Sequence, residues 1–316
     1  MPTHSRFYCH LLAFITVAVW GTTFVSTKVL LLEGLTPAQV FTLRFVMAYV
    51  LLAAWMVTQT MLHRASIPPA SVPPSSHHPS LLSRFRAVVK RELLMLALGV
   101  TGGSLYFMAE NEALNHTTAT NTSLIVCSCP LFAMMFIGMV YPSERVRRRQ
   151  WIGSLIAFVG MAVVVLNGRF VLHLEPIGDV LAFIACLCWA FYSLLMKPAL
   201  ARYSAMFVTR KVFFYGVLTI LPYFIFVPEW PPVEVLMRPQ VVGNLLFLGV
   251  IASMVCFLVW NWVIRQLGPV VATNWVYFNP ITTMLFAWWL LGESITLYFI
   301  IGAVLILLGM YLADRK

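Results

Sequence analysis

The chain has 316 residues, of which 61% are hydrophobic and only 10% are charged. Soluble domains carry about a quarter charged residues, so this composition excludes a soluble globular protein. The 21 Lys and Arg residues exceed the 11 Asp and Glu residues, and the net charge is +10. On a soluble chain that excess would suggest nucleic-acid binding, but in so apolar a chain it is first tested as loop charge that sets membrane orientation.

Ten apolar segments follow one another along the chain, each long enough to cross a bilayer as a helix. They lie at about 8–32, 37–58, 93–111, 117–140, 151–167, 177–197, 205–227, 241–264, 270–291 and 295–312. None alternates apolar with polar residues as the strands of a membrane barrel do. We therefore expect an all-α integral membrane protein with ten transmembrane helices. A cytoplasmic loop rich in Pro, Ser and His, at about 59–92, separates the second helix from the third.

The basic residues divide unequally between the two sides of this topology. With the N-terminus inside, internal loops and helix ends hold all of them except Lys28, Arg44, Arg169 and Arg238. This bias predicts that both termini are cytoplasmic. The basic cluster at 145–149 is then an anchor beside anionic lipid and not a nucleic-acid patch. We expect the lipid bilayer as a partner, and no nucleic acid.

The sequence also contains two similar halves. Three groups of residues recur in the second half with the same spacing. Trp20 and Lys28 correspond to Trp189 and Lys197, and Arg44 and Tyr49 correspond to Arg210 and Tyr215. Glu144, Gly153 and Gly160 correspond to Glu293, Gly302 and Gly309. We place the first repeat at 1–168 and the second at 175–316. Because each half has an odd number of spans, the second half enters the membrane from the opposite side. Such inverted repeats let a transporter expose one midplane site to each side in turn.

The repeated residues resemble a known family. The run Trp20-Gly-Thr-Thr-Phe-Val-Ser-Thr-Lys28, then Arg44-Phe-Val-Met-Ala48, Pro130 with Ser143-Glu144, and Asn279-Pro280 with Gly292-Glu293 resemble the two EamA repeats of the drug/metabolite transporter superfamily. The resemblance covers nearly the whole chain. It implies a ten-helix carrier of small metabolites with a central cavity between the halves, in a bacterial cytoplasmic (inner) membrane. The long Pro-rich loop and Ser143, where the family commonly has Gly, depart from its pattern.

Two prolines fall near the middle of predicted spans. Pro130 lies in the fourth helix and Pro280 in the ninth. A proline leaves the carbonyl four residues earlier, at Val126 or Val276, without its helical donor, so each helix kinks and opens at one depth. These openings either mark the substrate site or only bend the helices for packing.

Polar and aromatic side chains near this depth are candidates for the lining of a substrate-binding cavity. They are Trp20, Tyr106, Asn121, Trp189, Tyr192, Asn261, Asn274, Tyr277 and Asn279. Amides within a membrane are costly unless paired, so each Asn either faces a cavity or joins helices by hydrogen bonds.

Two charged residues complete the candidate set. Arg44 lies about 10 Å from the outer surface, where a bare cation is expensive. It either attracts an anionic group of the substrate or pairs with Glu33, Glu110 or Glu112. Glu110, near the outer mouth, is also a candidate for proton coupling.

The glycines of the last span in each half recur every seven residues, which favours close helix packing or the surface of a homodimer. The chain shows no catalytic motif, metal site or cofactor site. We therefore expect no enzyme but a secondary-active-type transporter that moves a small organic metabolite, such as an amino acid, a related compound or a drug, by alternating access. A non-transporting membrane scaffold or sensor with the same fold is the alternative.

Overall fold

The computed structural model describes residues 3–64, 81–117, 119–141, 146–166, 175–228, 230–291 and 296–314. Several predictions fall outside these ranges, among them those on Ser143, Glu144, Gly292 and Glu293. The side chain of Asn121 also lies outside the described residues.

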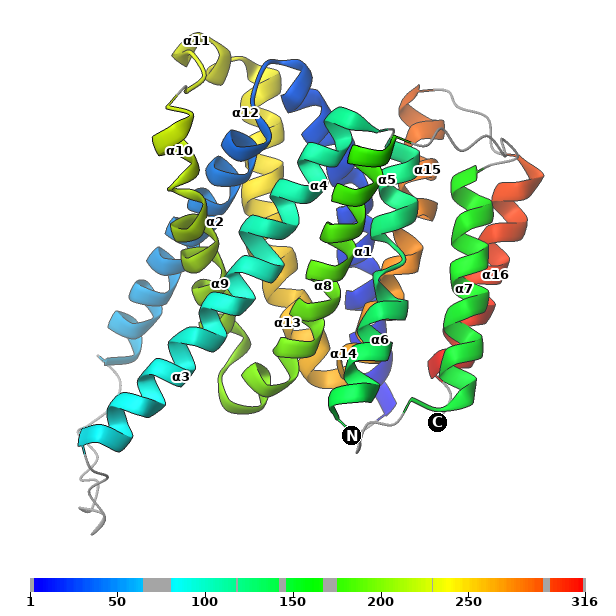
Figure 1. Cartoon of the computed structure of the whole chain (residues 1–316), viewed down its shortest axis with the longest axis horizontal. Helices are drawn as coiled ribbons and strands as arrows, with labels where there is room; N and C mark the ends of the chain where they lie inside the picture. The colour runs from blue at the N-terminus through cyan, green and yellow to red at the C-terminus, as the bar shows by residue number, and fades with distance from the viewer. Residues whose placement is uncertain are drawn as a thin grey trace.

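All secondary structure in the described chain is helical, which confirms the all-α prediction for these residues (Figure 1). Its helices are α1 (Thr3–Leu32), α2 (Pro37–Arg64), α3 (Leu81–Gly99), η1 (Val100–Ser104), α4 (Leu105–His116), α5 (Ala119–Val126), α6 (Cys129–Val140), α7 (Arg148–Leu166), α8 (Pro176–Arg202), α9 (Ala205–Ile220), α10 (Tyr223–Phe226), α11 (Val233–Leu236), α12 (Pro239–Leu246), η3 (Phe247–Val255), α13 (Cys256–Leu267), α14 (Pro269–Asn274), η4 (Trp275–Phe278), α15 (Asn279–Leu291) and α16 (Leu297–Asp314). The elements η1 and η3 are π-helical, and η4 is a 3₁₀ turn.

Among the described residues, eight helical stretches are long and apolar enough to cross a membrane, and Leu297–Ala313 is a shorter apolar helix. The span expected at 270–291 is divided into α14, η4 and α15. Both marked ends of the chain lie at the same end of the bundle (Figure 1).

The predicted bounds of the loop at 59–92 are wrong at both ends. Helix α2 continues to Arg64, and α3 already begins at Leu81. Residues 81–92 contain neither Pro nor Gly, and Leu, Arg, Lys and Glu favour a helix even where the sequence is polar. The Pro-rich stretch between the two helices lies outside the described residues.

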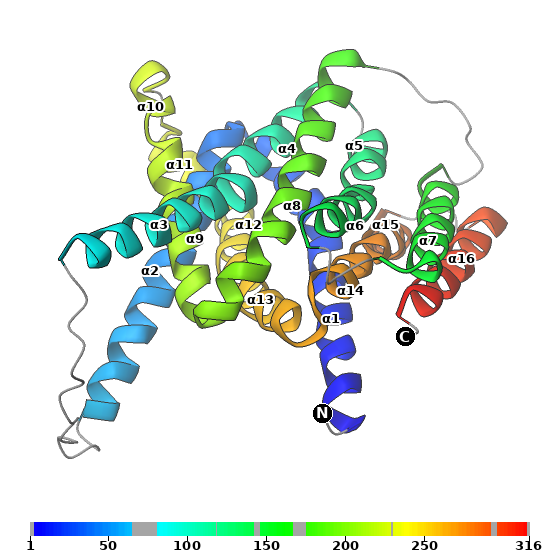
Figure 2. The same cartoon turned by 60° about the horizontal axis from the view of Figure 1, so that its bottom comes forward.

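The two halves of the chain use the same kinds of helix contact. Helix α4 packs on α8 while α1 packs on α13, and α2 packs along η3 while α9 packs along η1. Helix α6 contacts α8 while α1 contacts α15. At the centre, α1 and α8 run in opposite directions (Figures 1 and 2). They meet through the rings of Trp20 and Trp189, whose centroids are 5.4 Å apart.

Helices α7 and α16 form a pair at one edge of the bundle (Figure 2). Gly153 lies against Gly309, and Gly160 lies against Gly302, so the two helices are antiparallel. A Cβ atom on Gly160 would lie 2.7 Å from the Gly302 carbonyl oxygen, and one on Gly302 would lie 2.6 Å from the Gly160 carbonyl oxygen. The absence of side chains allows this close approach. The glycine faces are therefore used within one chain.

We predict that Gly160→Ala lowers the free energy of unfolding by about 1–3 kcal/mol, because the added methyl group must push α7 and α16 apart. Denaturant unfolding in detergent measures this change. The control is Gly243→Ala in α12, where a Cβ atom would meet nothing within 4 Å. Equal stability losses in the two variants would contradict the role given to the glycine contact.

Candidate substrate-binding pocket

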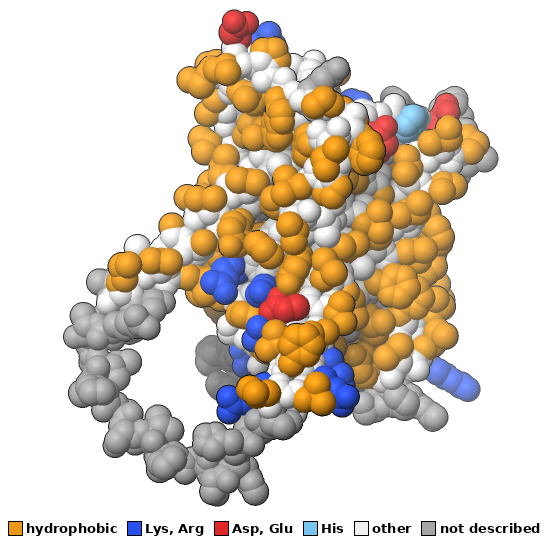
Figure 3. Space-filling model, turned by 60° about the vertical axis from the view of Figure 1, so that its left-hand side comes forward, with side chains coloured by type: hydrophobic (Ala, Val, Ile, Leu, Met, Phe, Trp, Pro, Cys, Tyr) orange, Lys and Arg blue, Asp and Glu red, His pale blue; other side chains and the backbone are white. Residues whose placement is uncertain are grey.

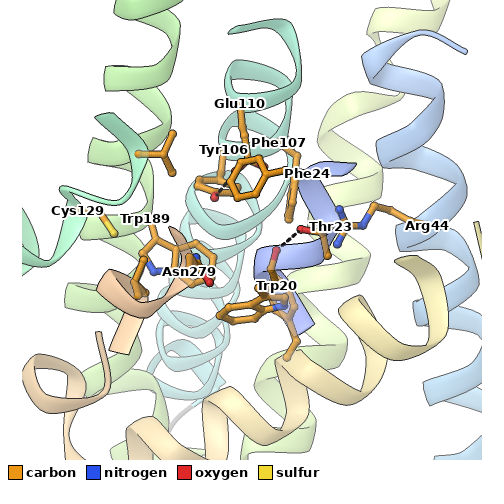
Figure 4. A pocket seen from close by; sticks show the side chains of 13 residues that line it. Trp20, Thr23, Phe24, Arg44, Tyr106, Phe107, Glu110, Cys129, Trp189 and Asn279 are labelled. Carbon is orange, nitrogen blue, oxygen red and sulfur yellow. Dashed lines mark hydrogen bonds between the residues drawn. The ribbon is translucent and has the colours of Figure 1, made fainter. Parts of the chain in front are cut away.

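A pocket lies between elements from both halves of the chain (Figure 4). It holds about 500 Å³ of empty space, which includes the solvent at its mouth. Its lining residues are Trp20, Thr23 and Phe24 on α1, Arg44 on α2, Tyr106, Phe107 and Glu110 on α4, Val126 on α5, Cys129 on α6, Trp189 on α8, Phe257 on α13, Val276 on η4 and Asn279 on α15. The pocket therefore collects Trp20, Arg44, Tyr106, Glu110, Trp189 and Asn279 from the predicted set.

Aromatic rings form one wall of the pocket. Trp20 and Trp189 meet edge to face, and the Tyr106 ring lies 5.1 Å from the Trp189 ring. The indole Nε1 of Trp20 donates a hydrogen bond to the Ala252 carbonyl oxygen at 3.0 Å, which fixes the Trp20 ring against η3. These rings present a rigid apolar surface with few rotatable bonds.

Arg44 places a buried cation in the pocket wall. Its side chain is only 2% exposed, and Nε donates to the Ser253 hydroxyl at 2.9 Å. The guanidinium carbon lies 4.5 Å from the centre of the Phe107 ring. Within the described residues, no carboxylate forms an ion pair with Arg44, and no group accepts a hydrogen bond from Nη1 or Nη2. Glu33 and Glu112, which the sequence offers as partners, pair with other residues.

Glu110 places a buried carboxyl group in the same pocket. One oxygen, Oε1, accepts a hydrogen bond from the Tyr106 hydroxyl at 2.7 Å. The other oxygen has no hydrogen-bond partner among the described residues. A carboxylate in this position can accept a hydrogen bond from a ligand cation or hold a proton. The pocket thus combines a guanidinium and a carboxyl group that form no ion pair with each other.

The two prolines stand where their helices are interrupted. Helix α5 ends at Val126, and Pro130 is the second residue of α6. The 3₁₀ turn η4 precedes α15, in which Pro280 is again the second residue. Val126 and Val276, four residues before the prolines, both line the pocket. The two interruptions therefore meet at the same cavity.

Other predicted residues lie in hydrogen-bonded contacts between helices. The Tyr192 hydroxyl donates to Asn261 Oδ1 at 2.8 Å, and Asn261 Nδ2 donates to the Thr209 hydroxyl at 2.8 Å. This chain connects α8, α13 and α9. The Tyr277 hydroxyl lies 2.9 Å from the Ser154 hydroxyl and connects η4 to α7.

Asn274 lines a second pocket, between α1, the α14–η4 segment and α16. This second pocket holds about 610 Å³ of empty space, again counted with its open side. Its remaining lining residues are His10, Val271, Trp275, Leu307, Met310 and Tyr311. The structure thus separates Asn274 from Asn279, although the two residues are close in sequence.

The sequence reasoning did not select Thr23, Phe24, Phe107, Cys129 or Phe257, which also line the central pocket. Thr23 and Phe24 follow Trp20 by one helical turn, and this spacing could have placed them on its face. Phe107 and Phe257 are two of 23 phenylalanines, and no local pattern distinguishes them.

Comparison with known proteins gives a family match in both halves. The family model described as the EamA-like transporter family matches residues 7–166 and again residues 176–313. An uncharacterised transporter of Archaeoglobus fulgidus is 26% identical over 97% of this chain and 97% of its own length. The uncharacterised inner membrane transporter YedA of Escherichia coli K12 is 24% identical over 94% of this chain and 90% of its own length.

Two further similarities bear on substrate and fold. A probable terminal-alkyne amino-acid exporter of Streptantibioticus cattleyicolor is 27% identical over 72% of this chain and 74% of its own length. A crystal structure of a protein with 18% sequence identity superposes with a TM-score of 0.69 and covers 98% of this chain and 97% of that chain. At that identity the similarity shows the fold alone.

Proposed function

The chain belongs to the EamA-like transporter family, and we propose that it carries a small zwitterionic metabolite of the amino-acid type through the central pocket. Family membership identifies an integral membrane transporter and not an enzyme. One observation carries the proposal on the substrate. Arg44 and Glu110 place opposite charges in one buried pocket without pairing with each other.

The pocket offers a separate group to each part of an amino acid. The free Nη atoms of Arg44 suit a carboxylate, which a guanidinium binds through two parallel hydrogen bonds. The free oxygen of Glu110 suits an ammonium group. The neighbouring rings of Trp20, Phe24 and Trp189 suit an apolar side chain and attract the ammonium group through their faces. A zwitterion would compensate both buried charges, which are costly within a membrane.

We propose that the halves are two inverted five-helix repeats and that both termini are cytoplasmic. The matched helix contacts of the two halves, and the antiparallel glycine contact of α7 with α16, support this arrangement. The placement of both chain ends at one end of the bundle is consistent with it (Figure 1). The basic loop residues would then place this end in the cytoplasm of a cell with a bacterial-type inner membrane.

The repeat also suggests how the pocket is closed on one side. The spacing that relates Trp20 to Trp189 relates Thr23 to Tyr192. Because α1 and α8 are antiparallel, these two residues lie on opposite sides of the tryptophan pair. Thr23 lines open space, whereas the Tyr192 ring is fully buried against Gly102. We propose that Tyr192 and its hydrogen-bonded partners form the seal that opens when the two halves rock.

We predict that ligand analogues separate the roles of the two charges. Among amino acids screened for thermal stabilisation of the purified protein, the best should lose its effect when its carboxylate or its amino group is removed. Arg44→Gln should weaken binding of the intact amino acid by about tenfold to a hundredfold, because a charge-assisted bond is lost. The variant should then bind the intact amino acid no better than the analogue that lacks the carboxylate. Glu110→Gln should bind the intact amino acid no better than the analogue that lacks the amino group.

Arg202→Gln is the matched control, because Arg202 is exposed in the last turn of α8, away from the pocket. Uptake into vesicles, with and without a proton gradient, then tests transport of the same compound. If no amino acid stabilises the protein or crosses the membrane, a scaffold or sensor explains the fold better than a carrier.

We predict that access to the two sides of the tryptophan pair alternates. Thr23→Cys should react with a membrane-impermeant thiol reagent from one side, whereas Thr209→Cys should be protected until substrate is added. The native cysteines are buried, and the unmodified chain measures their background. Reaction of both variants from the same side, unchanged by substrate, would contradict alternating access.

A further inference from the structure

The first ten residues of α3, Leu81–Lys90, are exposed on all sides; we refer to them as the α3 tip. The tip begins a run of helical elements, α3, η1 and α4, that covers Leu81–His116, or 36 residues, and is kinked at Gly103. At about 1.5 Å per residue the run holds about 54 Å of helix. A bilayer core about 30 Å thick needs only about 20 residues. The surplus of about 16 residues allows the tip to lie outside the hydrocarbon core.

The α3 tip carries an exposed apolar stripe. Its members are Leu81, Leu82, Phe85, Val88 and Val89, whose spacing places them on one face of the helix. Leu81 is 85% exposed and Phe85 is 66% exposed. An apolar stripe of this size would promote aggregation if it faced water, so we expect a partner to cover it.

Basic residues border this stripe on both sides. At 100° per residue, Arg84 falls next to one edge of the stripe and Arg86 next to the other, while Lys90 lies further round on the side of Arg86. The tip contains no acidic residue. Figure 3 shows hydrophobic side chains between Lys and Arg side chains near the lower end of the molecule in that view. An apolar face flanked by basic residues is typical of helices that lie in the surface of an anionic membrane.

The attachment of α3 to the bundle begins directly after the tip. The Glu92 carboxylate accepts hydrogen bonds from Lys211 Nζ at 2.7 Å and from the Tyr215 hydroxyl at 2.6 Å, both on α9. Beyond this contact the tip points away from the bundle, beside the end at which both chain ends lie (Figure 1). The tip is therefore held close to one membrane surface by the span that it continues.

We propose that the α3 tip is an interfacial helix that binds a bilayer surface containing anionic phospholipid. The apolar stripe would face the acyl chains, and Arg84, Arg86 and Lys90 would contact lipid phosphates. Charge selects this partner over a second copy of the chain, because two tips with three cations each would repel one another. The proposal concerns lipid binding and does not depend on what the pocket transports.

Spin labels on the two faces of the tip test the proposal in the full-length protein. In nanodiscs that contain phosphatidylglycerol, a label at Phe85→Cys should collide more with oxygen, which concentrates in lipid, than with a water-soluble nickel complex. A label at Ala87→Cys, on the opposite face, should show the reverse. Aqueous behaviour of both labels would overturn the proposal. Protection of the Phe85→Cys label from both reagents would also overturn it, because a protein surface would then cover the stripe.

Charge variants test the anionic lipid separately. With the Phe85→Cys label, the combined Arg84→Gln, Arg86→Gln and Lys90→Gln variant should lose at least half of the difference between oxygen and nickel collisions. Arg84→Lys with Arg86→Lys keeps the charge and should keep the difference. The difference should also shrink in phosphatidylcholine alone and at high salt, because salt screens surface charges. Equal depth in both lipids and in all variants would contradict a role for lipid charge.

Discussion

Two buried ionisable side chains that form no ion pair with each other set the conditions for the rest of this structure. Arg44 and Glu110 line one pocket within a helical bundle, where an isolated charge is expensive. Each is held by only part of its hydrogen-bonding capacity, through Ser253 for Arg44 and through Tyr106 for Glu110. The protein therefore keeps two incompletely hydrogen-bonded groups in one pocket. A ligand with both charges would satisfy them together, and this is the physical basis of the proposed substrate class.

The surrounding helices make this polar site compatible with a membrane. The interrupted helices bring Val126 and Val276 to the pocket, where non-helical backbone is tolerated because it lines a cavity and does not face lipid. Trp20 and Trp189 close the space between the halves with rigid rings. On the other side of these rings, the Tyr192 hydroxyl donates to Asn261 and the Asn261 amide donates to Thr209, and we propose that this side forms the seal. The same bundle thus holds incompletely bonded groups in the open pocket, and hydrogen-bonded Tyr192 and Asn261 on the side that we propose as closed.

The sequence allowed the helices, the two similar halves and part of the pocket lining to be predicted, for identifiable reasons. Hydropathy and length define a membrane helix locally, and prolines mark an interruption whatever the neighbours are. Depth along a helix does not say which way a side chain points. Asn261 and Asn279 were selected alike, but Asn261 joins helices whereas Asn279 reaches the pocket. Phe257 lines the pocket only because α13 packs on α1, a contact that one sequence does not show.

Counterflow across proteoliposomes tests the central claim of a carrier most directly. The liposomes are loaded with the unlabelled amino acid that stabilises the protein best, and a trace of the labelled compound is added outside. We predict that label accumulates transiently above its equilibrium level, and that Arg44→Gln in a folded protein abolishes this accumulation. Label that only equilibrates, or does not enter, in liposomes with correctly folded wild-type protein would contradict transport of this compound by alternating access.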